Sequence, residues 1–405
     1  MTELAPFDPF ELSDVPLGDV RDPYPAIAAE RLRHGGVKHG ALDVPGAMSG
    51  APEGQLVTVF GHDEVAQVLL DHESFASSVY EGFMGPVMGH TILEMDSPEH
   101  RGHRALVAHA FRQKMLARWE AGLIRVVVDE LIDRFAARGS AELVREFTFA
   151  FPAQVIARIL GLPRADYPRF QRWSIELISV SFNWDRGIAA SAALRDYFAQ
   201  VVAERRQAPA DDIISELTQV EIDGHRLSDE EIFAFLRLLL PAGVETTYRS
   251  SGNLLFGLLS DPVQLDAVRR DRSLLPQAIE EGLRWESPLM LIVRKAVRDV
   301  TVGGVEIKAG ATVAVCTGAA GRDDRYYNEP DRFDIYRTPQ PHLTFGFGPH
   351  VCLGMHLARL ETRIAVDALL DRLPDLRLDP AAEDVHIHGF TFRSPMALPV
   401  VFTPS

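Results

Sequence analysis

Cys352 stands in a segment whose residue types could give its sulfur chemistry. It belongs to FGFGPHVCLG, residues 345–354, which leads into MHLARLETRIAVDALLDRL, a stretch with the pattern of an amphipathic helix. Free amides at a helix start, together with the helix dipole, favour a thiolate over a thiol. The glycines let the backbone turn tightly and approach something flat and bulky. A thiolate held in this way could be a nucleophile, a structural thiol or an axial ligand to haem iron.

The residues alone leave several interpretations of Cys352 open. An isolated cysteine is most simply a buried thiol on a packed turn. Zinc binding is a weaker alternative, because His350, Cys352 and His356 lie close together in the sequence but offer one sulfur and no fourth ligand. A catalytic cysteine–histidine pair is also open, although no base can be placed by spacing alone.

The spacing of the segment adds a more specific signal. The order Phe345-Gly346-x-Gly348-x-His350-x-Cys352-x-Gly354 resembles the haem-binding signature of the cytochrome P450 family, the haem-thiolate monooxygenases. At the residue frequencies of this chain, such a match has about one chance in a million of arising at random. The resemblance implies that Cys352 is the fifth ligand of the iron in haem b, where its electron donation favours O–O cleavage. It also implies that Phe345, His350 and Gly354 bind the cofactor.

A second segment resembles the dioxygen-binding part of the same family. It reads Ala242-Gly243-Val244-Glu245-Thr246-Thr247 and follows the family pattern of a small residue, glycine, any residue, an acid and threonine. The resemblance implies that Thr246 bonds dioxygen and that Glu245 passes protons inward, which heterolytic O–O cleavage requires. Glu245 departs slightly from the aspartate that is commoner in bacterial members. Taken alone, the segment is equally a helix whose threonine bonds its own backbone.

Haem carries two propionates, which need cations. The segment DSPEHRGHR, residues 96–104, resembles the family's Asp-Pro-Pro-Glu-His-x-x-x-Arg, with Ser97 in place of the first proline. The resemblance implies that His100 and Arg104 bind the propionates, together with Arg294 and His350. An arginine suits a carboxylate best because its guanidinium can donate two hydrogen bonds to it. Each of these residues could instead be a solvated or structural cation.

Glu281 and Arg284 match a further family pattern, Glu-x-x-Arg, whose spacing puts both side chains on one helix face. The pattern is common in this chain, so its place after the long helix and before Pro330-Asp331-Arg332-Phe333 gives it meaning. The resemblance implies a buried network of Glu281, Arg284 and Arg332 under the cysteine loop. Its role would be in folding, and removal of one partner should cost about 3–5 kcal/mol.

These residues need elements that position them. Residues 55–60 and 289–316 carry β-branched residues and glycine turns, which predict short strands, and residues 386–402 predict a final hairpin. Most of residues 62–280 has helical periodicity. The longest candidate, residues 228–259, opens with a capping box and carries Pro241 in its middle, which predicts a local break. We therefore expect a mainly α fold with small β-sheets. The resemblance implies one P450 domain over residues 1–405, with a long central helix over the haem and the cysteine loop beneath it.

Composition excludes several classes of protein. The chain has 405 residues, of which 46% are hydrophobic and 24% charged, as in an ordinary globular protein. A formal net charge of −16 gives no broad attraction to nucleic acid or to an anionic membrane. Two cysteines cannot make a disulfide framework. The sequence shows neither a signal peptide nor an apolar run of about 18 residues, so we expect a soluble cytoplasmic protein.

The resemblance also implies a reaction and its partners. One atom of dioxygen would enter a hydrophobic small molecule by hydroxylation or epoxidation. Because no flavin-binding extension is present, electrons would come from a ferredoxin and an NAD(P)H-dependent reductase, with docking at Arg112, Lys114 and Arg359. Two alternatives stay open: other haem-thiolate chemistry, such as a peroxygenase or dehydratase, and a haem protein that only binds a ligand. Family position gives candidate pocket residues: Phe83, Met84, Val87, Met88, Val244, Leu291, Ile292 and Phe390.

Overall fold

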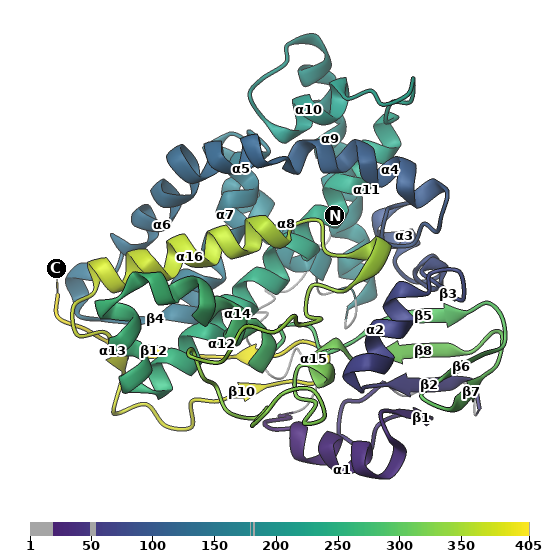
Figure 1. Cartoon of the computed structure of the whole chain (residues 1–405). Helices are drawn as coiled ribbons and strands as arrows, with labels where there is room; N and C mark the ends of the chain where they lie inside the picture. The colour runs from purple at the N-terminus through teal and green to yellow at the C-terminus, as the bar shows by residue number, and fades with distance from the viewer. Residues whose placement is uncertain (1–18, 49–53, 179, 181–182, 405) are drawn as a thin grey trace. The chain divides into compact units, whose positions relative to one another are not determined.

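The computed structural model describes residues 19–48, 54–178, 180 and 183–404, and Figure 1 shows them as a ribbon. Their contacts divide the chain into two compact units, each built from separate stretches of sequence. Of the described residues, those within 80–127 and 150–245 belong to unit 1, and those within 19–79, 128–149 and 246–404 belong to unit 2. The amino-terminal segment, in which the sequence predicts no signal peptide, lies outside the described residues.

Helices build unit 1. They are α3 (Gly85–Met88), α4 (Glu99–Ala108), α5 (Gln113–Trp119), α7 (Ala150–Ile159), α8 (Tyr167–Ile178), α9 (Trp184–Gln207), α10 (Ile213–Gln219) and α11 (Asp229–Leu240). Side-chain caps start several of them, since Asn183 accepts from the amide of Arg186 before α9, and Asp212 from that of Ser215 before α10. Helix α6 (Arg125–Ile132) crosses from unit 1 into unit 2.

The long helical segment is interrupted where the sequence predicts a break. Ser228 and Glu231 form the predicted capping box at the start of α11. Residues Pro241–Glu245 then form a π-helical turn, and α12 (Thr246–Ser260) continues in unit 2. Proline has no N–H for the hydrogen-bond ladder and its ring crowds the preceding turn, so the helix widens at this point. The predicted dioxygen-binding segment therefore coincides with the irregular turn.

A five-stranded sheet forms one part of unit 2. Its strand order is β1-β2-β8-β5-β3, and it comprises β1 (Val37–His39), β2 (Leu56–Val59), β8 (Thr312–Val315), β5 (Ile292–Ala296) and β3 (Phe75–Ala76). Strands β2 and β8 pair in parallel and the other pairs are antiparallel. Both regions that the sequence predicts as strands contribute to this sheet.

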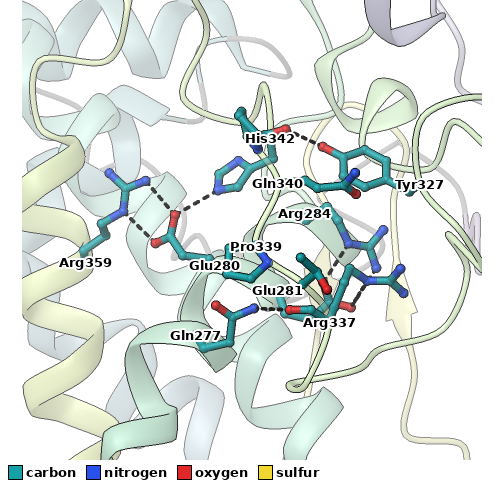
Figure 2. Close-up of a pocket in the computed structure, with 12 residues that line it drawn as sticks. Gln277, Glu280, Glu281, Arg284, Tyr327, Arg337, Pro339, Gln340, His342 and Arg359 are labelled. Atoms are coloured by element: carbon teal, nitrogen blue, oxygen red, sulfur yellow. Dashed lines mark hydrogen bonds and ion pairs between the residues drawn. The ribbon is translucent and has the colours of Figure 1, made fainter.

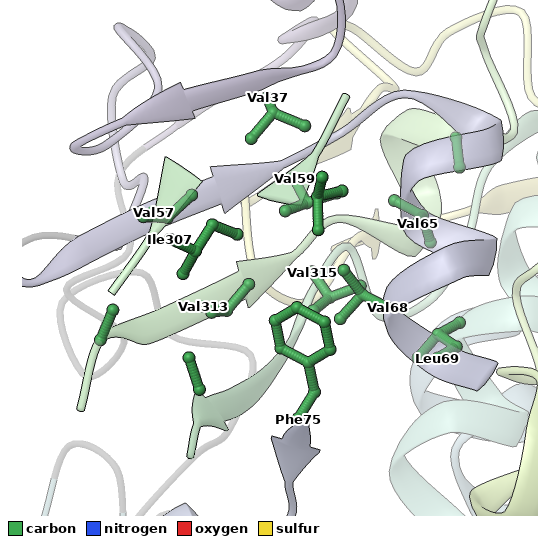
Figure 3. Close-up of a cluster of buried hydrophobic side chains, with 14 of the residues drawn as sticks. Val37, Val57, Val59, Val65, Val68, Leu69, Phe75, Ile307, Val313 and Val315 are labelled. Atoms are coloured by element: carbon green, nitrogen blue, oxygen red, sulfur yellow. The ribbon is translucent and has the colours of Figure 1, made fainter. Parts of the chain in front are cut away.

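Aliphatic side chains from the sheet pack against α2 (His62–Leu70), as Figure 3 shows. Val59 and Val315 from the strands meet Val65 and Val68 from the helix, and all four are at most 1% exposed. β-Branched residues suit this arrangement because they favour the extended backbone and fill the sheet surface. The resulting core holds β5 and α2, two elements that the candidate site uses.

The remaining elements of unit 2 are helices and short strand pairs. The helices are α1 (Tyr24–His34), α13 (Pro262–Arg270), α14 (Leu275–Trp285), α15 (Thr317–Ala320) and α16 (Met355–Arg372). The strands are β6 (Val300–Val302) with β7 (Val305–Ile307), β10 (Ile387–His388) with β11 (Ser394–Pro395), and β4 (Ser140–Glu142) and β9 (Arg377–Leu378) on either side of β12 (Pro399–Val401). The predicted carboxy-terminal hairpin is the β10–β11 pair.

The expected fold class, mainly α with small β-sheets, is confirmed. Within the described ranges, no helix combines the length and the apolar character needed to cross a membrane. The expectation of a single domain over residues 1–405 stays a prediction.

Candidate cofactor and oxygen site

The cysteine loop is a closed turn that leaves the thiol accessible. The amide of Cys352 donates to the carbonyl of Phe345 at 2.7 Å, which closes the loop, and the Cys352 side chain is exposed. Gly346 and Gly348 have φ values of 74° and 73°, a region that favours glycine. A Cβ at Gly348 would lie 2.6 Å from the carbonyl oxygen of Leu69 at the end of α2. The glycines are therefore required for the loop to pass close to α2.

The two cysteines of the chain lie in opposite environments. Cys352 comes just before α16, where the free amides of a helix start stabilise a thiolate. Cys316 is fully buried, and this burial raises the pKa of its thiol to about 12. An exposed sulfur at a helix start can serve as a ligand or nucleophile, whereas Cys316 is an inert core residue.

Strand pairing brings two predicted cations toward the cysteine loop. Strand β3 pairs with β5 so that Ala76 lies opposite Lys295, and one further step of this antiparallel register places Ser77 beside Arg294. The hydroxyl of Ser77 is 3.2 Å from Nε2 of His350, two residues before Cys352. Arg294 is only 6% exposed, and its guanidinium donates to the carbonyl of Val293. Arg294, His350 and the cysteine loop are thus neighbours in unit 2.

The Glu281–Arg284 ion pair is present, but its third partner differs from the prediction. Arg284 donates to both carboxylate oxygens of Glu281, at 2.7 and 2.8 Å, and both residues are buried. Arg337 completes the network with a 3.2 Å bond to Glu281, as Figure 2 shows. The prediction of Arg332 was wrong: its side chain is 60% exposed and pairs with Glu329 and Asp334. Arg332 contributes its backbone carbonyl, which accepts from Arg284 and Arg337.

A second charged cluster supports Phe345. The guanidinium of Arg359 lies 4.5 Å from the centre of the Phe345 ring and donates two 2.7 Å bonds to Glu280. His342 lies on the same carboxylate, and Figure 2 shows Glu280 between these two residues. Burial by itself would raise the pKa of Glu280, but the bonds from Arg359 and His342 outweigh it and lower the pKa to about 2. The cluster lines a cleft of about 430 Å³.

The segment that the sequence predicts to bind dioxygen has an irregular backbone. Val244 and Glu245 are 1% and 5% exposed, and Thr246 is half-buried at the start of α12. A Cβ at Gly243 would lie 3.1 Å from Ile156 of α7, so glycine here permits close helix packing within unit 1. Glu245 and Thr246 are consecutive in the chain, the last residue of unit 1 and the first of unit 2.

His100 and Arg104 lie on one face of α4 in unit 1, four residues apart. His100 is 2% exposed and Arg104 is half-buried. A buried histidine on the same helix face as a partly buried arginine is better suited to bind an anion than to interact with solvent. Their assignment to the propionates stays a prediction.

The candidate pocket residues fall into two groups. In unit 1, Phe83 is 45% exposed, Met84 is half-buried, and Val87 and Met88 are buried in or beside α3, while Val244 is buried in the π-helical turn. In unit 2, Leu291 and Phe390 belong to a hydrophobic cluster with Tyr24, Ile27 and Phe60, and Ile292 begins β5. Packing accounts for the burial of Leu291 and Phe390, and their contact with substrate stays a prediction.

The residues of unit 2 fit a haem. The group needs an axial ligand, cations for its propionates and a backbone that can approach a flat ring. Here the exposed Cys352 thiol supplies the first, Arg294 and His350 the second, and the glycine turns at 346 and 348 the third. The sequence pointed to Cys352, His350 and the glycines through one motif and to Arg294 through a separate family match, but it missed Ser77, Glu280 and Arg337, for which no spacing gave a signal.

The chain is similar to known proteins of one family over most of its length. The family model for cytochrome P450 matches residues 167–382. Cytochrome P450 107B1 of Saccharopolyspora erythraea is 41% identical over 304 residues, 74% of this chain and 74% of that protein. Steroid C26-monooxygenase of Mycobacterium tuberculosis is 37% identical over 321 residues, 78% of this chain and 86% of the relative.

Solved structures agree in fold. CYP109E1 of Bacillus megaterium, crystallised with testosterone, aligns with a TM-score of 0.84 and 33% identity, covering 94% of this chain and 99% of that one. The chain therefore belongs to the cytochrome P450 family and is a haem-dependent monooxygenase of that family.

Proposed function

We propose that the protein inserts one atom of dioxygen into a hydrophobic small molecule, by hydroxylation or epoxidation, with haem b held by the thiolate of Cys352. The observation that carries the proposal is the exposed Cys352 thiol on a closed glycine loop at the start of α16. When bound, the haem supplies the iron chemistry that activates dioxygen.

In this proposal, four cations predicted from the sequence hold the cofactor by its propionates. They are His100, Arg104, Arg294 and His350. Arg294 suits the role because it is buried on β5, where a guanidinium bonds a carboxylate strongly in the absence of water. Phe345 packs beside the cofactor, held by the Arg359 guanidinium above its ring. Gly354, the residue before α16, lets the backbone pass close to it.

Glu245 and Thr246 handle protons in the proposed reaction. The π-helical turn frees backbone groups of the regular ladder, and such groups can hold water. Thr246, half-buried at the start of α12, presents its hydroxyl to dioxygen, and Glu245 transfers protons from outside. This pair favours oxygen activation over peroxygenase or dehydratase chemistry, which needs no such relay.

The proposed electron donors are a ferredoxin and an NAD(P)H-dependent reductase, in the cytoplasm where NAD(P)H is available. Two of the three predicted docking residues have their positive charge partly neutralised by a neighbouring carboxylate. Arg112 pairs with Glu216 at 3.2 Å, and Arg359 pairs with Glu280. Lys114 is exposed on α5. We therefore expect Lys114 to contribute more to ferredoxin affinity than either arginine.

Isotope labelling tests the proposed reaction. An apolar compound that shifts the haem to high spin is incubated with NADPH, a ferredoxin, a reductase and ¹⁸O₂. We expect one ¹⁸O atom per product molecule from the wild type. Thr246→Ala should give a severalfold lower yield of product per NADPH, because the threonine hydroxyl no longer directs proton delivery and NADPH is consumed without product formation. Product formed only with peroxide, or formed without ¹⁸O, would favour the alternative haem-thiolate chemistries.

A further inference from the structure

Arg237, in α11 of unit 1, is a buried cation held by neutral groups. Only 8% of the Arg237 surface is exposed to solvent. Nε donates to the carbonyl of Phe233 at 3.2 Å, and Nη1 donates to the carbonyl of Val87 at 3.4 Å and to the hydroxyl of Ser191 at 3.0 Å. Among the described residues, no carboxylate lies within 4.0 Å of the guanidinium. The guanidinium is therefore largely removed from water without a carboxylate in direct contact to offset the cost.

Five other buried arginines have a carboxylate close by. Each of the following lies within 4.0 Å of one: Arg31 of Asp323, Arg186 of Glu176, Arg284 of Glu281, Arg322 of Glu286 and Arg393 of Glu286. For Arg237, burial lowers the pKa and the charge of Arg195 lowers it further, while the charge of Glu230 raises it. The Arg237 guanidinium thus lacks the direct carboxylate contact that these five arginines have.

One edge of the Arg237 guanidinium is left available beside the loop that follows α3. Nη2 has no hydrogen-bond partner among the described residues, whereas Nε and Nη1 are both held. A Cβ at Gly89 would lie 3.0 Å from Nη2, and Gly89 has a φ of 83°, so the loop approaches the guanidinium closely only because it carries glycine. The guanidinium is therefore fixed in place before any ligand arrives.

The same contacts place Arg237 at the predicted substrate pocket. Its Nη1 bonds the backbone of Val87, a residue that the family resemblance assigns to the pocket. Its helix, α11, leads directly into the π-helical turn that contains Val244, another such residue.

We propose that Arg237 binds an anionic group of the substrate, so that the substrates of this enzyme are hydrophobic molecules carrying a carboxylate. The inference rests on the proposed monooxygenase function and deepens it by naming the substrate class. A carboxylate would supply the missing counter-charge and accept the hydrogen bond that Nη2 can donate. Desolvation of this pair by the apolar walls would strengthen the bond.

Matched acids and esters test the proposal on the holoprotein. The probes are dodecanoic acid, 5β-cholanic acid and 4-phenylbutanoic acid, each paired with its methyl ester, and affinity is measured by the spin-state shift and by calorimetry. A charge-assisted hydrogen bond corresponds to about a 10–100-fold change in affinity. We expect Arg237→Met to reduce the ester-to-acid ratio of dissociation constants at least about tenfold, through weaker binding of the acid. A ratio within twofold of the wild type would overturn the proposal.

Arg195→Met is the matched control. Arg195 lies on α9, pairs with Glu230 and is exposed, yet it contributes to the electrostatics of Arg237. We expect this variant to keep the wild-type preference for acids. An equal loss in both variants would show that general positive charge, and not the Arg237 guanidinium, selects the acid, and would overturn the proposal.

Stability gives a second, independent readout that needs neither bound probe nor substrate turnover. If Arg237 serves to bind a ligand, its desolvation lowers the stability of the ligand-free protein. The acceptors survive its removal, since the Val87 carbonyl also accepts from the Ser191 hydroxyl. We therefore expect Arg237→Met to raise the melting temperature of the ligand-free protein. A lower melting temperature would mean that Arg237 holds the α3 loop or meets a charge elsewhere in the chain, which would overturn the proposal even if the haem spectrum is normal.

Discussion

At the scale of single residues, the carboxylate of Glu281 shows how one buried charge organises its surroundings. It accepts from Arg284, from Arg337 and from the backbone amide of Asp334. The two arginines also bond the carbonyl of Arg332. A carboxylate that is fully hydrogen-bonded in this way stabilises the fold, because every partner lost leaves a buried group without compensation.

This network gives a prediction about two arginines five residues apart. Arg337→Met should lower the free energy of unfolding by about 1–3 kcal/mol, because its removal takes a hydrogen-bond partner from the buried carboxylate of Glu281. Arg332→Met should change it by at most about 0.5 kcal/mol, since that side chain is exposed. Urea unfolding of the two holoprotein variants measures both values. A larger loss of unfolding free energy in Arg332→Met than in Arg337→Met would show that the Arg332 side chain belongs to the network.

His388 predicts an acid sensitivity of the fold. It is 6% exposed, and neither ring nitrogen has a hydrogen-bond partner among the described residues. Burial, followed by the charge of Arg249, lowers its pKa from 6.5 to about 4. The folded state therefore keeps the ring neutral where the unfolded chain protonates it. This contribution to stability is complete above pH 6.5 and is lost as the pH falls toward 4.

The test compares unfolding free energies at pH 7 and pH 5. We expect His388→Leu to reduce the difference between them by about 1–2 kcal/mol relative to the wild type. His225→Gln, at an exposed histidine, should keep the wild-type difference. If His388→Leu shows the full acid sensitivity, another group is responsible.

At the scale of elements, the cysteine loop and the π-helical turn are the two irregular segments on which the site depends. The loop is shaped by glycines against α2, and the turn by Pro241 between α11 and α12. The glycines permit the positive φ values of the loop, and Pro241 removes one hydrogen bond from the helical ladder. Their irregularity is therefore a property that a single substitution can remove.

The loop predicts a clear difference between two glycines. Gly348→Ala would place a Cβ 2.6 Å from the Leu69 carbonyl at a positive φ, so we expect severalfold lower haem content in the purified protein. Gly310→Ala shares the positive φ, at 90°, but meets nothing within 4 Å. The Gly310→Ala variant therefore shows the effect of backbone strain alone, without a steric clash of the new Cβ. Equal haem content in the two variants would show that close approach to α2 does not shape the loop.

The sequence predicts those features that depend on neighbours in the chain. The capping box at Ser228 and Glu231 and the break at Pro241 are of this kind, and both are confirmed. The partner of Glu281 depends on how a loop more than forty residues away folds back, so Arg332 was chosen by pattern and Arg337 was missed. The contact of Gly348 with Leu69 and the setting of Arg237 are likewise visible only in three dimensions.

At the scale of the whole molecule, the two compact units are each built from separate stretches of sequence. The chain passes from one unit to the other several times, so neither unit is a continuous segment of the kind that usually forms a separate domain. We therefore propose that residues 1–405 form a single domain in the holoprotein.

Calorimetry tests the single domain. The holoprotein should unfold in one transition, and the Soret absorbance should be lost at the same temperature. Two separated transitions would show that the two units unfold independently and would contradict a single domain.

The absorption spectrum of the reduced protein with carbon monoxide tests the central claim, thiolate ligation by Cys352, most directly. We predict a strongly red-shifted Soret band in the wild type and in Cys316→Ser, because the buried Cys316 takes no part. The band should be lost in Cys352→His. A wild-type band typical of histidine-ligated haem, or a red-shifted band that persists in Cys352→His, would contradict the account.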